Sequence, residues 1–174
     1  MMRKRPTTGF TLIELMVTVS IMAIIAMIAA PALQMFVDKT RLKGATDRLY
    51  ADMQFARSEA VKRNSSVSIS FSTGSNWCYG INAGGACNCN TANACSIKTV
   101  SHSEFSGITL DGATFTASST TFNPVLGTLS AAGLARVQSA GGKQACVHMS
   151  LIGQIRLCSP AGSAKLGGYP TCSC

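Results

Sequence analysis

The chain carries near its beginning the stretch Thr7-Thr8-Gly9-Phe10-Thr11-Leu12-Ile13-Glu14-Leu15, and a predominantly apolar segment follows it as far as Val37. From Leu15 to Leu33 none of the nineteen residues is charged. A helix of that length measures roughly 28 Å, close to the thickness of the hydrocarbon core of a bilayer. The stretch therefore predicts a helix that spans a membrane.

Charged residues near the start of this segment predict its orientation in the membrane, and one of them, Glu14, needs a partner of opposite charge. The basic cluster Met1–Arg5 is expected to stay on the cytoplasmic side while the rest of the chain is translocated. Glu14 lies inside the apolar region, where an ionised carboxylate costs about 2.5–3.5 kcal/mol, so it needs a partner. A cleaved signal peptide fits poorly because the apolar run is too long and contains an acid. An uncleaved signal anchor is the simpler alternative.

The segment Gly9-Phe10-Thr11-Leu12-Ile13-Glu14 resembles the leader of type IV prepilins and of type II secretion pseudopilins. The resemblance implies that a prepilin peptidase cuts after Gly9 and that the new N-terminal Phe10 becomes N-methylated. It also implies that Glu14 neutralises the N-terminal ammonium of a neighbouring subunit, which supplies the missing partner. The expected partners are other major and minor pilins, with the inner membrane holding the subunit before assembly.

Helical periodicity continues beyond the apolar segment. Pro31 is expected to kink the helix without necessarily ending it. Apolar residues then recur at spacings of three and four on one stripe, namely Leu42, Ala45, Leu49, Met53, Ala56 and Ala60. We therefore predict one helix from about Phe10 to about Arg63. The expected organisation is a cleaved leader over residues 1–9, an apolar assembly helix over 10–37, an amphipathic continuation over 38–63, and a β-rich domain over 64–174.

Beyond Asn64 the pattern changes to the alternation typical of half-buried strands. The strands expected are Val67–Ser72, Trp77–Ile81, Ile97–Val100, Ile108–Leu110, Thr114–Phe115, Thr120–Phe122, Leu134–Gln138, Ala145–Leu151 and Gln154–Cys158. Many short strands after one long helix predict an α+β chain, with a disulfide-linked β domain packed on the second half of the helix. The segment Tyr50–Arg63 and the last strand pair are similar to the FimT, FimU and GspH group of minor pilins and minor pseudopilins.

Cysteine usage indicates an oxidising compartment. All eight cysteines follow residue 77: Cys78, Cys87, Cys89, Cys95, Cys146, Cys158, Cys172 and Cys174. In an exported chain they predict disulfides, and a zinc site is not expected because no CxxC pair occurs and neither histidine is near the first four. Eight cysteines allow 105 pairings; we expect the first four to pair among themselves and the last four likewise, the alternative being that Cys172 and Cys174 tie the tail to the first group. A turn at 152–153 would place Cys146 and Cys158 nearly opposite, close enough for a cross-strand bond.

The last strand pair carries the best sequence hint of a binding site. Four side chains are expected to face the core: Val147, Met149, Ile155 and Leu157. His148, Gln154 and Arg156 then lie on the other, cationic face. In FimT proteins of naturally transformable bacteria, a G-R-x-R motif in this region is associated with DNA binding. Here it reads Gly153-Gln154-Ile155-Arg156, so Gln154 replaces one arginine and loses a phosphate-pairing charge.

Charge and motifs limit the function. With the leader removed, 12 basic and seven acidic residues leave a formal charge of +5, which is compatible with binding an anionic surface. The candidate contacts to double-stranded DNA are Arg136, Lys143, Gln154, Arg156 and Lys165; the alternative is that these are solvated surface residues. No phosphate loop or catalytic motif appears, so neither an enzyme nor a cofactor is expected.

Three functions remain open at the sequence level. The first is a minor type IV pilin that takes part in pilus assembly at or near the tip. The second adds non-specific DNA binding during natural transformation. The third is a GspH-like minor pseudopilin of a type II secretion system. The first two place the protein as a single-pass inner-membrane protein before assembly and in the extracellular pilus afterwards, with the β domain periplasmic or extracellular.

Overall fold

The structure, a computed structural model, describes residues 9–174. The basic cluster Met1–Arg5 and the predicted leader up to Thr8 lie outside the described residues. The chain divides into two compact units, the first ending at Val37 and the second spanning Asp38–Cys174. Each unit is described by itself.

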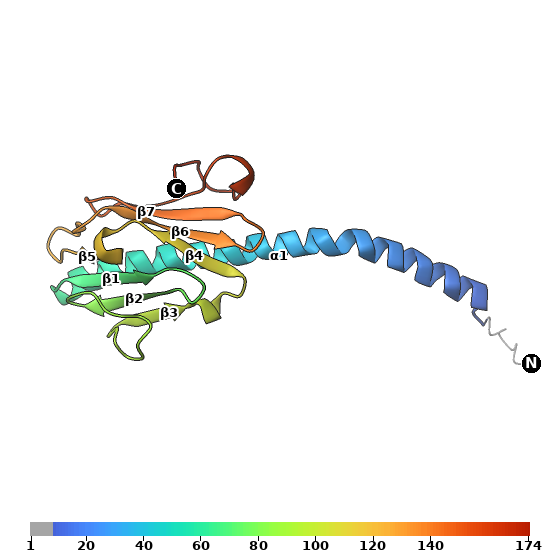
Figure 1. Ribbon diagram of the computed structural model, residues 1–174, viewed down its shortest axis with the longest axis horizontal. Coiled ribbons are helices and arrows are strands. Elements are labelled where there is room, and N and C mark those ends of the chain that lie inside the picture. Colours follow the sequence, from blue (N-terminus) through green and yellow to red (C-terminus); the bar gives the residue numbers. More distant parts are fainter. Residues whose placement is uncertain (1–8) are drawn as a thin grey trace, which may run out of the picture. The chain divides into compact units, whose positions relative to one another are not determined.

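A single helix, α1, spans Leu12–Arg63 and contributes to both units (Figure 1). It continues through Pro31, the residue expected to kink the helix without necessarily ending it. The helix ends where Asn64 adopts a left-handed backbone with φ of 48° and the amide of Ser65 donates to the carbonyl of Ala60. This is a common helix-terminating arrangement, so the boundary expected near Arg63 is confirmed.

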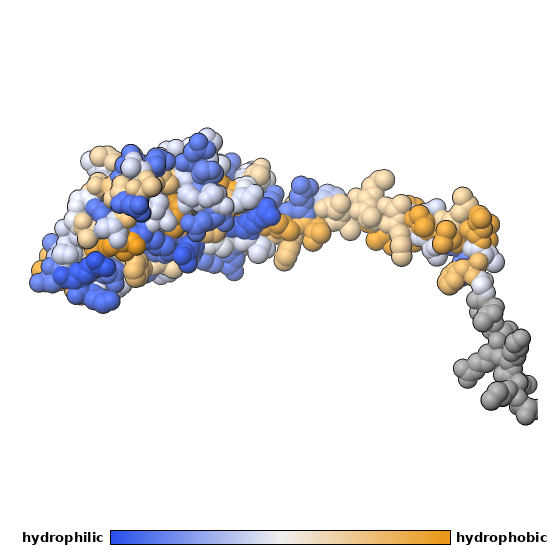
Figure 2. Space-filling view, turned by 90° about the horizontal axis from the view of Figure 1, so that it is seen from below, coloured by the Kyte–Doolittle hydropathy of each residue, from blue (hydrophilic) through white to orange (hydrophobic). Residues whose placement is uncertain are grey.

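In the first unit, α1 presents its apolar side chains outward. Every residue from Gly9 to Phe36 is exposed, and Figure 2 shows the apolar surface that these side chains form. By length and composition, α1 is apolar enough to cross a membrane. Within residues 9–37, the described part of this unit, nothing buries these side chains, so lipid or other protein has to cover them.

In the second unit, the helix buries the stripe that the sequence predicts. All six stripe residues are at most 5% exposed: Leu42, Ala45, Leu49, Met53, Ala56 and Ala60. They belong to one core cluster together with residues of both β-sheets. The small Ala side chains at the end of the stripe let the helix approach the strands closely. The prediction of a β domain packed on the second half of the helix is therefore confirmed.

The strands form two four-stranded antiparallel sheets (Figure 1). The first has the order β3-β2-β1-β5, with bounds β1 Val67–Ser72, β2 Cys78–Ala83, β3 Lys98–Ser101 and β5 Ser119–Phe122. The second has the order β4-β6-β7-β8, with bounds β4 Ile108–Ala113, β6 Gly133–Ser139, β7 Gln144–Met149 and β8 Ile155–Cys158.

One expected strand is wrong. Thr114–Phe115 is not a strand but the connection from β4 to the short 3-10 helix η2, Thr116–Ser118. Phe115 alternates with Thr114 only because it fills the core, where its ring stacks on Phe71 with centroids 5.1 Å apart. Two residues of alternation do not distinguish a strand from one anchored side chain.

A buried carboxylate fastens α1 to the first sheet. Asp52 accepts a hydrogen bond from the Tyr79 hydroxyl at 2.8 Å and pairs with Lys98 Nζ at 2.6 Å. Arg48, one turn earlier on the helix, lies 3.4 Å away through its Nε. A carboxylate with three such partners stabilises the contact, whereas the same charge without them would be costly to bury.

The first four cysteines pair among themselves, as expected. Cys78 is bonded to Cys89, and Cys87 to Cys95. Both disulfides pin the loop between β2 and β3. Gly80 of β2 lies directly beneath them, and a Cβ there would collide with the sulfur of Cys95. The sheet can carry this loop so closely only because residue 80 is glycine.

Candidate functional site

The β7–β8 hairpin separates core-facing from outward-facing side chains in the predicted way. Val147 lies opposite Leu157 and His148 opposite Arg156. Val147 is fully buried and Leu157 packs against the core, whereas Arg156 is exposed. Met149 is also buried. The outward face of this hairpin therefore carries two of the candidate DNA contacts, Gln154 and Arg156.

The turn between these strands is tightly constrained. The amides of Ser150 and Gly153 donate to the carbonyls of Gln154 and Ser150, at 3.0 and 2.9 Å. Gly153 has a φ of +78°, and a Cβ there would collide with the carbonyl of Gly127. Arg57 of α1 donates through Nη1 to the Gly153 carbonyl at 3.2 Å. The positive φ and the nearby carbonyl of Gly127 thus explain why position 153 is a glycine.

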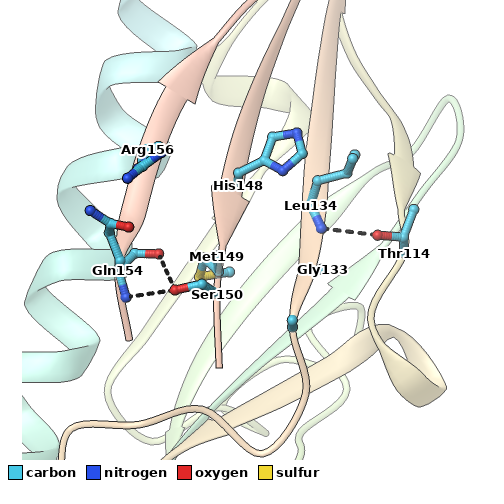
Figure 3. Close-up of a pocket in the computed structure, with 9 residues that line it drawn as sticks. Thr114, Gly133, Leu134, His148, Met149, Ser150, Gln154 and Arg156 are labelled. Atoms are coloured by element: carbon cyan, nitrogen blue, oxygen red, sulfur yellow. Dashed lines mark hydrogen bonds between the residues drawn. The ribbon is translucent and has the colours of Figure 1, made fainter. Parts of the chain in front are cut away.

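An open groove of about 520 Å³ lies beside this turn (Figure 3). Its lining includes Leu134, His148, Gln154 and Arg156. Gln154 and Arg156 are exposed, and among the ion pairs of residues 9–174 none involves Arg156. A guanidinium without a carboxylate partner at the rim of an open groove is suited to an anion.

Arg136 also faces outward, but it is engaged. It lies opposite Cys146 in the register between β6 and β7. Its Nε pairs with Asp111 of β4 at 2.9 Å. The ion pair neutralises most of the charge that Arg136 would offer to a phosphate.

The two candidate lysines lie at the other end of the sheet. Lys143, in the β6–β7 turn, donates through Nζ to the carbonyl of Ser163 at 2.6 Å. The backbone of Lys165 forms an isolated β-bridge with the backbone of Gln144, the first residue of β7. Four residues of strand separate Gln144 from the level of His148 and Arg156, which is about 14 Å. The expected cations therefore form two separate groups instead of one compact patch.

The chain after β8 is held across the outward face of the hairpin by two disulfides. Cys146 is bonded to Cys174, and Cys158 to Cys172. The last four cysteines thus pair among themselves, as expected, but the cross-strand bond between Cys146 and Cys158 is wrong. The two lie opposite one another in the register. Each bonds instead to the tail that returns over the hairpin. The spacing of residues along the strands does not reveal the path of that tail.

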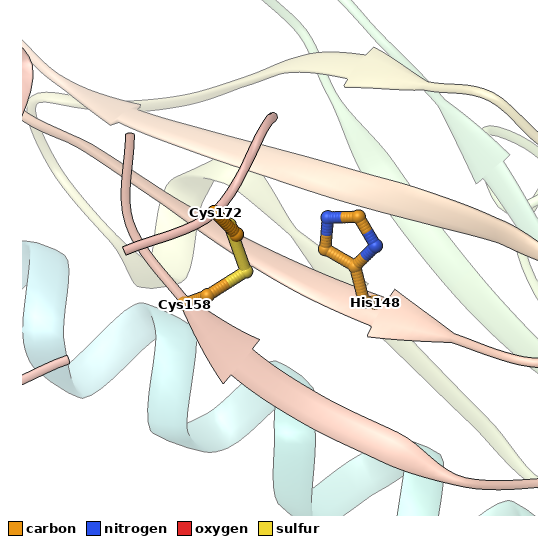
Figure 4. A group of neighbouring side chains, drawn as sticks. All are labelled: His148, Cys158 and Cys172. Carbon is orange, nitrogen blue, oxygen red and sulfur yellow. A yellow bond between two sulfur atoms is a disulfide. The ribbon is translucent and has the colours of Figure 1, made fainter. Parts of the chain in front are cut away.

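His148 adjoins this tail and lies close to a disulfide. Its Nε2 is 3.0 Å from the carbonyl oxygen of Ser173. His148, Cys158 and Cys172 offer ligand atoms within 4.8 Å of one another, the spacing of a metal site (Figure 4). The two sulfur atoms are bonded to each other, so neither is the thiolate that a metal requires. The cluster is structural.

The predicted assembly residues lie at the beginning of α1. Phe10 is 81% exposed, and Glu14 is exposed as well. Thr11 caps the helix, since its Oγ1 accepts the amide of Glu14 at 3.3 Å. No ion pair of Glu14 is found within residues 9–174. Its carboxylate is thus open to a partner outside the chain.

Arg57 is the residue near this site that sequence reasoning missed. It lies in the segment Tyr50–Arg63 that carries the family resemblance, and periodicity predicts only an outward-facing helical residue. The structure places its guanidinium against the backbone of Gly127 and Gly153. A half-buried arginine beneath two glycine turns has no signal in a single sequence.

Comparison with known families matches residues 45–164 to the family described as type II transport protein GspH, and residues 4–30 to the prokaryotic N-terminal methylation motif. The first match covers well over half of the chain. The protein therefore belongs to this family of minor pilins and minor pseudopilins. No curated protein sequence matches it.

One solved structure supports the fold. A crystal structure of the type IV minor pilin FimU of Pseudomonas aeruginosa PAO1 is similar with a TM-score of 0.52 and 22% identity. The match covers 77% of this chain and 98% of FimU. A second crystal form of FimU matches with a TM-score of 0.48 at the same identity, over 74% of this chain and 98% of that one. At this identity the likeness concerns the fold alone.

Proposed function

We propose that this protein is a minor subunit of a type IV pilus, inserted through the first half of α1 during assembly. One observation carries the proposal: every residue from Gly9 to Phe36 is exposed and most are apolar, and the match to the N-terminal methylation motif, over residues 4–30, covers most of this segment. Such a surface is stable in lipid before assembly and among the equivalent helices of other subunits afterwards.

The residues at the start of the helix have distinct roles in this proposal. Cleavage after Gly9 leaves an ammonium group at Phe10, which is then methylated. Glu14 pairs with the ammonium of a neighbouring subunit, because both charges are unfavourable in an apolar environment and stabilise one another there. Residues 38–63 carry the β domain on the outside of the filament. The role is structural, and catalysis has no part in it.

Glu14→Ala tests the proposal in cells that make the filament. Glu14→Ala leaves the ammonium of the neighbouring subunit unpaired in an apolar environment, at a cost of about 2.5–3.5 kcal/mol, so incorporation into sheared filaments is expected to fall by more than about tenfold. The control is Ser20→Ala, because the Ser20 hydroxyl is already bonded to the Met16 carbonyl of its own helix at 2.8 Å. Filament content is measured by immunoblot against the membrane fraction. Normal incorporation of Glu14→Ala would contradict the charge-pairing role.

The same geometry suits a minor pseudopilin of a type II secretion system, which is the alternative. The two are separated by deleting the gene and measuring surface piliation and protein secretion in parallel. Loss of piliation with normal secretion supports the pilus. Loss of secretion with normal piliation supports the pseudopilin.

Non-specific DNA binding is a second candidate function of the outward face of the hairpin. It is favoured by the exposed guanidinium of Arg156 beside the groove, with Gln154 as an adjacent hydrogen-bond donor. Contacts of this kind bind the phosphate backbone and do not read the bases. Lys143 and Lys165 would reach only a ligand that extends along the whole sheet.

A further inference from the structure

Four exposed apolar side chains of the second unit gather at two loop tips. Val125 and Leu126 belong to the β5–β6 connection, and Leu151 and Ile152 to the β7–β8 turn. Their exposed fractions are 80%, 70%, 55% and 71%. We call these four residues the tip patch. Contiguous exposed apolar surface on an otherwise polar domain marks an interaction site.

The two loops are held side by side. The amide of Leu129 donates to the carbonyl of Leu151 at 2.8 Å. The carbonyl of Gly127 lies so close to Gly153 that no side chain fits between them. Arg57 of α1 contacts both glycines from below. The tip patch is therefore one surface, although its halves are 25 residues apart in the sequence.

Each loop is also fixed internally. The Oδ1 of Asn123 accepts the amides of Val125 and Leu126, at 2.9 and 3.1 Å. The β7–β8 turn is closed by the hydrogen bonds between Ser150 and Gln154 described above. Apolar side chains on a pre-organised backbone lose little entropy on binding, which is the character of an anchor in a protein interface.

The position of the tip patch favours protein over lipid. Asp38, where the second unit begins, lies beside Gly141 of the β6–β7 turn. Arg57, beneath the tip patch, follows 19 residues later, which is about 28 Å along the helix. The tip patch thus lies at the end of the unit remote from its junction with the apolar segment that a bilayer would hold.

Charge argues against a second copy as the partner. The second unit contains 12 Lys and Arg against six Asp and Glu, a formal charge of +6. Four of the six acids are already engaged within the unit: Asp47, Asp52, Glu59 and Asp111. Two copies would bring like charges together with few carboxylates to offset them. A surface rich in carboxylates fits better beside Arg156.

We propose that the tip patch docks onto a neighbouring filament subunit of different sequence, whose surface offers an apolar recess bordered by carboxylates. The inference rests on the proposed function as a filament subunit. Val125, Leu126, Leu151 and Ile152 enter the recess, and Arg156 faces the carboxylates.

Cross-linking in the assembled filament identifies the occupant. A photoreactive phenylalanine analogue replaces Leu126 or Ile152 in the full-length protein, with Phe55 as the control position because it is 40% exposed on α1. The expected product joins the tip patch to a different subunit, at a peptide that contains apolar residues and Asp or Glu. A product with a second copy or with lipid, or no product, overturns the proposal.

Substitution measures the contribution of the tip patch. The double variant Leu126→Ser/Ile152→Ser removes apolar surface that is exposed, so the fold is retained, and thermal unfolding verifies this. Recovery of the cross-linked neighbour with filaments is expected to fall by about tenfold or more, whereas Phe55→Ser leaves it unchanged. Equal recovery with both variants overturns the proposal. Absence of the wild-type protein from all filaments would instead contradict the proposed function.

Discussion

Gly153 is fixed by two independent constraints, and both are local. Its φ of +78° disfavours any side chain, and the neighbouring carbonyl of Gly127 leaves no room for a Cβ. The family motif marks this glycine from the sequence alone. Its reason appears only in the structure, because Gly127 comes from another loop.

Gly153→Ala is expected to destabilise the second unit more than the matched change Gly142→Ala. Gly142 has a similar φ of +75° but nothing within 4 Å of its Cβ position. The backbone conformation alone costs about 1–2 kcal/mol in both variants, and the clash with Gly127 adds about 1–3 kcal/mol in the first. Denaturant unfolding of the domain from Asp38 onward measures the difference. Equal losses of unfolding free energy in the two variants would show that the turn relaxes away from Gly127.

Tyr79→Phe removes one of three partners of the buried Asp52. The lost hydrogen bond to a charged group is expected to lower the free energy of unfolding by about 1.5–3 kcal/mol at neutral pH. Fluorescence-detected unfolding measures it. Tyr169→Phe is the control, since its bond to Asp47 is more exposed and its loss is smaller.

The same tyrosine gives a pH dependence. Burial and the charge of Asp52 raise the pKa of Tyr79 well above its ordinary value of about 10. The unfolded chain therefore releases the proton at a lower pH than the folded one, so this stabilisation is complete below pH 10 and is lost as the pH rises above it. The wild-type protein is expected to lose stability between pH 10 and 12 more steeply than Tyr79→Phe. Parallel slopes would contradict the raised pKa.

Individual elements differ in how well the sequence predicts them. The helix α1 was predictable to within two residues because six apolar residues repeat on one stripe and Asn64 ends it. The hairpin of β7 and β8 was predictable because four residues alternate on each strand. The disulfides of the tail were not, since Cys172 and Cys174 reach β7 and β8 by an irregular path without periodicity.

The tail after β8 depends on its two disulfides. Cys158→Ser/Cys172→Ser is expected to lower the free energy of unfolding by about 2–4 kcal/mol while Cys146–Cys174 still holds the tail. A four-cysteine tail variant, in which Ser replaces Cys146, Cys158, Cys172 and Cys174, is expected to release the tail and leave His148 more exposed. Limited proteolysis within residues 160–171 measures the release.

Cys78→Ser/Cys89→Ser is the matched control, because this disulfide ties the β2–β3 loop to the first residue of β2, away from the tail. It is expected to reduce stability without raising cleavage of the tail. Equal cleavage in the control and in the four-cysteine tail variant would mean that global unfolding, and not tail release, admits the protease.

At the scale of the whole molecule, DNA binding distinguishes the candidate functions. The domain from Asp38 onward, with its disulfides intact, is titrated with double-stranded DNA at two salt concentrations. If Arg156 contacts a phosphate, Arg156→Gln weakens binding and reduces the slope of log affinity against log salt by about 0.9.

Arg41→Gln is the control for this titration, because it removes the same charge from an exposed position of α1 outside the hairpin. It is expected to change the affinity less than Arg156→Gln does. Unchanged affinity of Arg156→Gln at low salt would exclude the strand as a DNA contact and leave a purely structural subunit.

The pairing of the last four cysteines has a consequence for the way this protein matures. If the β domain is exported N-terminal side first, as the proposed function requires, Cys146 and Cys158 reach the oxidising compartment before their partners do. They also lie opposite one another once the hairpin forms. A premature bond between them would strand Cys172 and Cys174 as free thiols. Efficient production of the native protein therefore calls for a disulfide isomerase as well as an oxidase.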